Sequence, residues 1–313
     1  MKRTIELKSK RKSKPSKPTT NGNANKFDIY QAVTDRIISQ LEQGIIPWKK
    51  SWQGNEPINY ITRKPYRGIN TLLLKQGGEY ATFKQIKDSG GSVLKGEKSQ
   101  MIVFWKVLER ENPEGEKEKI PFLKYYNVFH ISQTTLESKL EPINPAADHD
   151  PIEAAESVIS DYTGRTGVKP RLVTGTHQAY YTPSTDEVTM PTLNQFTSPE
   201  AYYSTYFHEL AHSTGHKSRL NRLDATAAFG SQVYSKEELV AEISSAQVMS
   251  FTGIELPDTF ENSVAYIKNW LSKLKDDKKL IVTAASAAQK ATDLILNTPA
   301  YSETETESET TAG

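Results

Sequence analysis

Tyr206-Phe207-His208-Glu209-Leu210-Ala211-His212 is the stretch of the sequence that says most about the fold. It places two histidines four residues apart and a glutamate directly after the first. On an α-helix, residues four apart lie about 40° from each other around the axis, so both imidazoles point the same way. They can then bind one metal ion, with Glu209 close enough to act as general base on a metal-bound water. The pattern is typical of zinc hydrolases.

Signals for the two ends of a helix surround this stretch. Ser198, Pro199 and Glu200 predict an N-cap, a first-turn proline and a first-turn acid, and an apolar run follows them. Gly215 predicts the end of the helix. The sequence therefore predicts a helix that presents both histidines as metal ligands, and it places His216 in solvent just past the helix end.

Two histidines do not complete a catalytic zinc site, which usually has three protein ligands. Because the chain has no cysteine, the third ligand must be a carboxylate or another histidine. Residues 234–242 predict a second helix with Glu238 and Glu242 on one face. We expect Glu238 to bind the metal and Glu242 to accept the outer N–H of a ligand histidine. Ser235 and Glu238 also fit a capping box, in which case Glu242 becomes the ligand, and Glu237 or a distant group stays open.

Two short strands are predicted directly before the metal-binding helix. Residues 179–183 and 186–191 alternate in the manner of strands around a turn at Ser184-Thr185. In a zinc peptidase an exposed edge strand of this kind pairs with an extended peptide substrate, although an ordinary hairpin is an equal alternative. Tyr234 is expected either to donate a hydrogen bond to an oxyanion or to pack at the helix entry.

The composition describes a soluble protein with room for two domains: 313 residues, 36% hydrophobic and 25% charged. No apolar run is long enough to cross a bilayer, and the first residues lack the apolar core of a secretory signal, so no membrane partner is expected. The absence of cysteine excludes disulfides and suits the cytoplasm.

Charge is divided unevenly along the chain. Residues 1–130 carry 25 Lys and Arg against 13 Asp and Glu, and residues 131–313 carry 14 against 25. The basic half is therefore expected to meet a polyanion. We predict that residues 1–26 form a disordered basic tail and residues 298–313 a disordered acidic tail.

The basic half predicts a small α+β domain. Apolar residues at helical spacing from Ile29 to Leu41 predict a first helix that Gly44 ends. A second helix is expected to start near Asn70. Further on, the sequence predicts a short helix at 82–87, a turn at 95–98, and two antiparallel strands at 101–107 and 122–128.

Aromatic and basic residues alternate in this half of the chain. Aromatic rings stack on bases and cations follow phosphates without demanding a sequence, which favours single-stranded DNA as the ligand. Core packing is an equal explanation for the rings. The residues predicted to contact DNA are Trp48, Lys49, Lys50, Arg63, Lys64, Tyr66, Arg67 and Lys84.

Both halves of the chain resemble one family. Pro47-Trp48, Lys64-Pro65-Tyr66-Arg67-Gly68-Ile69-Asn70 and Val103-Phe104-Trp105-Lys106 resemble the N-terminal domain of ArdC-type antirestriction proteins. The stretch from His208 to His216, together with that from Glu237 to Glu242, resembles the zincin-type metallopeptidase domain of the same proteins. The resemblance covers residues 27–296.

The resemblance implies two α+β domains: a single-stranded-DNA-binding domain at 27–139 and a zincin-like metallopeptidase domain at 152–297, joined by a linker at 140–151. It implies a protein of conjugative plasmids and other mobile elements that binds single-stranded DNA nonspecifically and protects incoming DNA from host restriction. Zn²⁺ or another divalent metal would be bound at the zincin motif. Two alternatives stay open: a DNA-shielding protein with a structural or inactive metal site, and a peptidase that acts on a partner protein without binding DNA.

Overall fold

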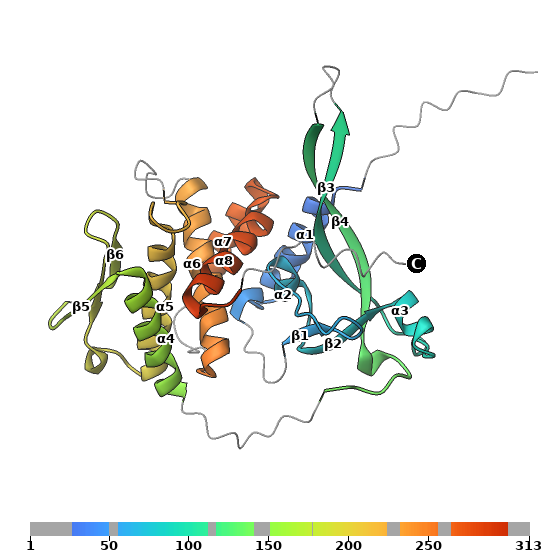
Figure 1. Cartoon of the computed structure of the whole chain (residues 1–313), viewed down its shortest axis with the longest axis horizontal. Helices are drawn as coiled ribbons and strands as arrows, with labels where there is room; N and C mark the ends of the chain where they lie inside the picture. The colour runs from blue at the N-terminus through green and yellow to red at the C-terminus, as the bar shows by residue number, and fades with distance from the viewer. Residues whose placement is uncertain are drawn as a thin grey trace, which may run out of the picture.

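The computed structural model describes residues 27–49, 56–111, 117–140, 151–176, 178–223, 232–255 and 264–299. Helices and two small sheets fill these ranges, which confirms the α+β class (Figure 1). One sheet has the strand order β1-β2-β4-β3, and the other has the order β5-β7-β6. The predicted tails and the predicted linker lie almost wholly outside the described residues.

The first half builds the four-stranded sheet and the helices beside it. α1 begins at Asp28, whose side chain accepts the N–H of Gln31, and α3 begins with a capping box between Thr82 and Gln85. The elements are α1 (Ile29–Glu42), η1 (Pro47–Lys49), β1 (Pro57–Asn59), α2 (Ile69–Leu73), β2 (Gly78–Thr82), α3 (Phe83–Asp88), β3 (Gln100–Glu111), β4 (Lys117–His130) and η2 (Ile131–Gln133).

β3 and β4 pair in antiparallel fashion as predicted, and both are longer than the sequence indicated. The sequence did not predict β1 and β2. β1 has only three residues, too few to show a periodic pattern, and the three central residues of β2 are all buried, so β2 lacks the alternation that marks a strand.

The second half consists of helices around a three-stranded sheet. Its elements are α4 (Pro151–Thr166), β5 (Lys169–Val173), β6 (Tyr180–Thr182), β7 (Glu187–Pro191), η3 (Leu193–Gln195), α5 (Pro199–Thr214), α6 (Gln232–Thr252), α7 (Val264–Asp276) and α8 (Leu280–Leu296). α5 starts at Ser198, whose hydroxyl accepts the N–H of Ala201, as predicted. α6 starts upstream of Ser235, so the capping-box alternative for Ser235 and Glu238 is wrong.

One hydrophobic core joins the two halves of the chain. Val33 and Ile37 of α1, Val103 of β3 and Leu239 of α6 belong to the same buried cluster, together with much of α7 and α8. α8 packs against α5 and α6, whereas α7 packs mainly against α1. The N-terminal half is therefore in direct contact with the helix that carries the carboxylates.

A second core fixes the orientation of α5. Tyr203, Phe207 and Leu210 are fully buried against α4, β7 and α6. Because these residues occupy one side of α5, the histidines are turned toward α6. Among the helices in the described part of the chain, none has the length and hydropathy that a bilayer span requires.

Candidate metal centre

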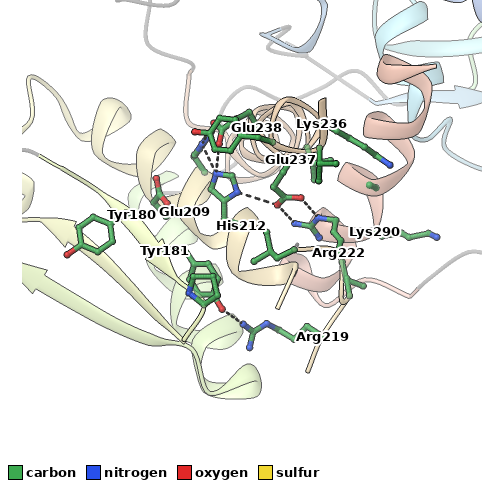
Figure 2. A pocket seen from close by; sticks show the side chains of 18 of the residues that line it. Tyr180, Tyr181, Glu209, His212, Arg219, Arg222, Lys236, Glu237, Glu238 and Lys290 are labelled. Carbon is green, nitrogen blue, oxygen red and sulfur yellow. Dashed lines mark hydrogen bonds and ion pairs between the residues drawn. The ribbon is translucent and has the colours of Figure 1, made fainter. Parts of the chain in front are cut away.

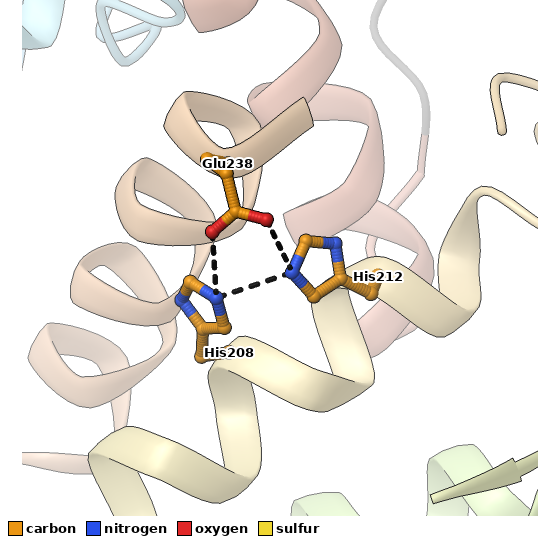
Figure 3. Close-up of side chains that lie close together, drawn as sticks. All are labelled: His208, His212 and Glu238. Carbon is orange, nitrogen blue, oxygen red and sulfur yellow. Dashed lines mark hydrogen bonds and ion pairs between the residues drawn. The ribbon is translucent and has the colours of Figure 1, made fainter. Parts of the chain in front are cut away.

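His208, His212 and Glu238 meet where α5 packs against α6. The Nε2 atoms of the two histidines lie 3.1 Å apart. One carboxylate oxygen of Glu238 lies 3.6 Å from Nε2 of His208, and the other lies 3.6 Å from Nε2 of His212. Figure 3 shows the carboxylate facing both rings. All three side chains are only partly exposed.

These separations suit one small divalent ion. Zinc lies about 2.1 Å from its nitrogen and oxygen ligands, so two ligands of a tetrahedral ion are about 3.4 Å apart. The observed separations lie close to that value on either side. Three protein ligands leave a fourth position for water or substrate, as catalytic zinc sites require.

Glu209 lies beside His208, His212 and Glu238 and lines the same cavity. The cavity has a volume of about 1070 Å³ and is bounded by β6, α5, α6 and α8 (Figure 2). Glu209 is 9% exposed, so its carboxylate is largely shielded from bulk water. The three side chains are thus at the wall of a space that is large enough to admit a peptide segment.

Glu237, not Glu242, contacts the outer nitrogen of His212. Nδ1 of His212 lies 3.3 Å from Oε1 of Glu237. Arg222 donates two hydrogen bonds to the same carboxylate, from Nε at 2.8 Å and from Nη2 at 2.9 Å. A carboxylate in this position fixes the tautomer and the orientation of a metal-binding histidine. The sequence suggested neither Glu237 in this role nor Arg222, because only the packing of the turn after α5 onto α6 brings them together.

Arg222 reaches this position because Gly215 has no side chain. Arg222 also donates to the carbonyl oxygen of Ala211 at 2.7 Å and to the hydroxyl of Thr214 at 2.8 Å. A Cβ on Gly215 would lie 2.8 Å from Leu223 and 3.2 Å from Arg222. The glycine at the end of α5 therefore allows the turn to fold back against the helix.

The surroundings of His208 are strongly negative. Burial lowers the pKa of His208, but a hydrogen bond with Glu238 raises it. The charges of Glu209 and Glu242 add to this effect, and the resulting pKa is about 9. Oε2 of Glu242 accepts a hydrogen bond from the hydroxyl of Tyr266 at 3.0 Å. The cluster therefore favours a positive charge between the two helices, which a divalent ion supplies.

Tyr234 lies in the first turn of α6 and lines the cavity. Burial raises the pKa of its hydroxyl, and the nearby charge of Glu238 and a hydrogen bond with Glu238 raise it further, to about 12. The hydroxyl stays protonated at neutral pH and remains a hydrogen-bond donor. His216 lies past the end of α5, where its Nδ1 atom contacts the hydroxyl of Ser218 at 2.7 Å.

The predicted hairpin is confirmed as β6 and β7, and β6 is the edge strand of its sheet. Arg219 donates to Asp186 at 2.9 Å, and the hydroxyl of Tyr181 donates to the same carboxylate at 2.7 Å. A further hydrogen bond runs from Arg219 to the carbonyl oxygen of Ser213 at 2.8 Å. These contacts attach the hairpin to the end of α5, so β6 is held at the rim of the cavity.

The aromatic residues predicted to contact DNA lie in the core instead. Trp48 is 3% exposed, packs edge-on against Trp270, and donates through Nε1 to the hydroxyl of Tyr266 at 3.2 Å. Tyr66 is 6% exposed and packs against Tyr80. Neither ring offers a free face to a base, so the expectation that they stack on DNA is corrected.

Two of the basic residues that were predicted to contact DNA form ion pairs with other residues of the chain. Arg63 pairs with the buried Glu79, and Arg67 pairs with Asp293 of α8. Both guanidinium groups therefore already have carboxylate partners. Among the other predicted contacts, Lys84 is exposed on α3 and Lys64 is partly buried. The side chains of Lys49 and Lys50 lie outside the described residues.

Two family models match two separate parts of the chain. Residues 27–129 match the family model of the N-terminal domain of the anti-restriction factor ArdC. Residues 158–287 match the family model of a zincin-like metallopeptidase. The fold and the site thus define a class of protein with an ArdC-type N-terminal domain followed by a zincin-like domain.

Whole-chain similarity narrows this class to one family. The crystal structure of the antirestriction protein ArdC from plasmid R388 is 37% identical, with a TM-score of 0.69, and the match covers 87% of this chain and 98% of that one. Its metal-free and Mn(II)-bound forms match equally well. An uncharacterized protein, y4eC of Sinorhizobium fredii, is 33% identical over 288 residues, and the match covers 91% of its length. The chain belongs to the family of ArdC antirestriction proteins.

A further relative is a much longer protein. DNA primase TraC of Escherichia coli is 34% identical over an alignment of 303 residues, and the match covers 87% of this chain but only 20% of TraC. The chain therefore corresponds to one part of TraC, and the likeness does not extend to the rest of that protein.

Proposed function

We propose that the chain binds single-stranded DNA nonspecifically through its N-terminal half and carries a zinc-dependent peptidase in its C-terminal half. In the cytoplasm it would protect incoming mobile-element DNA from host restriction. The observation that carries the enzymatic part is the meeting of His208, His212 and Glu238 at the cavity wall, with Glu209 beside them. Membership of the ArdC family supports the DNA-binding and protective part.

His208, His212 and Glu238 would hold the ion. When bound, zinc polarises the peptide carbonyl and lowers the pKa of water, which supplies a nucleophile at neutral pH. Glu209 would accept the proton of the attacking water and return it to the leaving amine. Tyr234, which stays protonated, would turn its hydroxyl from Glu238 to donate a hydrogen bond to the oxygen on which charge develops.

The edge strand β6 would bind the substrate backbone. An extended peptide can add to an exposed sheet edge through main-chain hydrogen bonds, and β6 ends at the cavity rim. The network of Arg219, Asp186 and Tyr181 would keep this strand in register with the metal ligands. Positioning of this kind matters because small displacements of a bound substrate slow the reaction strongly.

Replacement of Glu209 by Gln tests the enzymatic part. The substitution keeps the shape of the side chain and removes the base, so we expect zinc to stay bound while proteolysis of a casein substrate falls by about 100-fold or more. Glu200→Gln, on the same helix but outside the cavity, is the matched control. Metal content by mass spectrometry and plasmid transfer into restricting and non-restricting recipients are measured on the same variants.

The outcomes separate the alternatives. Loss of proteolysis with full protection in Glu209→Gln would favour a DNA-shielding protein whose metal site is structural or inactive. One observation favours that alternative. The chain matches the metal-free and Mn(II)-bound forms of the R388 protein equally well, so the fold of that protein is also found without metal. Absence of salt-dependent binding to oligo-dT would instead favour a peptidase that acts on a partner protein.

A further inference from the structure

The hairpin of β3 and β4 has two faces with different surroundings. Paired residues of an antiparallel sheet lie on the same face, and neighbours along a strand alternate between faces. Val103 pairs with Tyr125 and Trp105 pairs with Leu123, and this face packs against α1. The opposite face, which we call the outer face, consists of Gln100, Ile102, Phe104 and Lys106 of β3 and Phe122, Lys124, Tyr126 and Val128 of β4.

Only one end of the outer face is covered. Ile102 and Val128 are buried under Tyr66 and Leu74. Beyond them the strands continue past α1, and the hairpin stands away from the helices (Figure 1). Phe122, on this uncovered part, is 41% exposed.

Aromatic rings and lysines alternate along the outer face from Ile102 and Val128 toward Phe122. Phe104 and Tyr126 are partly buried and pack edge-on with ring centroids 5.8 Å apart. The ammonium group of Lys124 lies 5.0 Å from the centroid of the Tyr126 ring. In the strand register, Lys106 is opposite Phe122 and Lys124 is opposite Phe104. Each cation therefore has an aromatic neighbour on the same face.

The charge of the hairpin distinguishes the two faces. Residues 100–106 and 122–128 contain two lysines, and both lie on the outer face. None of the eight side chains of that face is acidic. The inner face over the same span has no charged residue. A purely apolar patch would suit a protein partner, whereas rings with interleaved cations suit a flexible polyanion with stacking bases.

We infer that the outer face of the β3–β4 hairpin is the surface on which single-stranded DNA binds, a placement that rests on the DNA binding proposed above. Bases stack on Phe122, Tyr126 and Phe104, and Lys106 and Lys124 follow the phosphates. The aromatic positions span about 13 Å along β4, at about 3.3 Å per residue. That length suits about four stacked nucleotides, because stacked bases are about 3.4 Å apart.

Fluorescence anisotropy with labelled oligo-dT tests this placement on the full-length protein. Phe122→Ala removes an exposed ring from the outer face, and Tyr125→Ala is the matched control, since Tyr125 on the inner face is also 41% exposed. Loss of one base-stacking contact lowers affinity by about fivefold or more, so we expect Phe122→Ala to weaken binding by at least about fivefold. Tyr125→Ala is expected to leave the affinity within about twofold of the wild type.

Replacement of single lysines provides a second test, because it changes the salt dependence of DNA binding without altering the hydrophobic core. Lys124→Gln removes one phosphate contact, so the slope of log affinity against log salt should become shallower by about 0.7. Lys87→Gln, on the exposed part of α3, is the control and should keep the wild-type slope.

The outcomes distinguish this inference from the proposed function. If the wild-type protein binds oligo-dT and both Phe122→Ala and Lys124→Gln bind it as tightly, the outer face is not the DNA site, while the proposed function stands. If the wild-type protein does not bind oligo-dT at all, the DNA-binding part of the proposed function fails and this placement fails with it. Thermal unfolding of each variant establishes that it is folded.

Discussion

Glu237 lies 3.3 Å from the Nδ1 atom of His212, on the opposite side of the imidazole from the nitrogen that faces Glu238. The histidine is thus held between two carboxylates from neighbouring positions of α6. Arg222 in turn holds Glu237 with a pair of hydrogen bonds. The orientation of one proposed metal ligand therefore depends on the turn that follows α5.

Loss of the Glu237 charge is expected to weaken metal binding without removing a ligand. Because carboxylates that orient ligand histidines contribute about 10–100-fold to metal affinity, Glu237→Gln should weaken zinc binding by about that factor. Competition with a chelating dye measures the affinity, with Glu200→Gln as the control. Equal affinities for the two variants would contradict the role of Glu237.

A side chain at Gly215 should displace the same turn. Gly215→Ala places a Cβ 2.8 Å from Leu223, and we expect an overpacking cost of about 1–3 kcal/mol together with weaker zinc binding. Gly164→Ala is the control, because Gly164 lies within α4 and no atom lies within 4 Å of the added Cβ. That substitution should stabilise the protein by about 0.5–1 kcal/mol. Urea unfolding measures the stability of both variants. Similar changes in unfolding free energy at the two glycines would contradict the close contact between Gly215 and Leu223.

The buried Asn70 is expected to stabilise the edge of the first sheet. Its side chain donates to the carbonyl oxygen of Val103 and accepts the N–H of the same residue, each at 2.8 Å. Asn70→Ala leaves both backbone groups buried without these partners, so the free energy of unfolding should fall by about 2–4 kcal/mol. Asn127→Ala, at an exposed position of β4, should change it by less than about 0.5 kcal/mol. A loss below about 1 kcal/mol for Asn70→Ala would show that these hydrogen bonds are dispensable.

Glu79 is expected to make folding sensitive to acid. Burial raises the pKa of Glu79, but hydrogen bonds from Arg63, Ser138 and the N–H of Lys139 outweigh it and hold the pKa below its ordinary value of 4.5. A carboxyl with a lowered pKa in the folded state adds stability above its unfolded pKa. That stability is lost as the pH falls through the lower, folded value.

Comparison with Glu79→Gln isolates this effect. The difference in unfolding free energy between wild type and variant should be constant at neutral pH and should shrink below pH 4.5. Chemical denaturation at a series of pH values measures the difference. A difference that stays constant throughout the acid range would mean that folding does not lower the pKa of Glu79.

Local sequence signals were enough to predict α5. Its N-cap, first-turn proline and final glycine all lie within or next to the helix, and the spacing of the two histidines fixes their common face. The same holds for α1 and for the pairing of β3 with β4, whose signals lie in their own residues.

Contacts between distant segments could not be predicted in this way. Trp48 is buried because α7, more than 200 residues later in the chain, supplies Tyr266 and Trp270. Arg67 is neutralised by Asp293, which is equally distant. Aromatic and basic composition was the ground for predicting DNA contacts, but only the tertiary structure determines which of these residues remain at the surface.

We propose that His208, His212 and Glu238 together bind one divalent ion. Crystals grown with zinc, with diffraction recorded on both sides of the zinc absorption edge, reveal where the ion binds. We expect one anomalous peak about 2.1 Å from the Nε2 atoms of both histidines and from an oxygen of Glu238. A peak elsewhere, or none between these three side chains at saturating zinc, would contradict it.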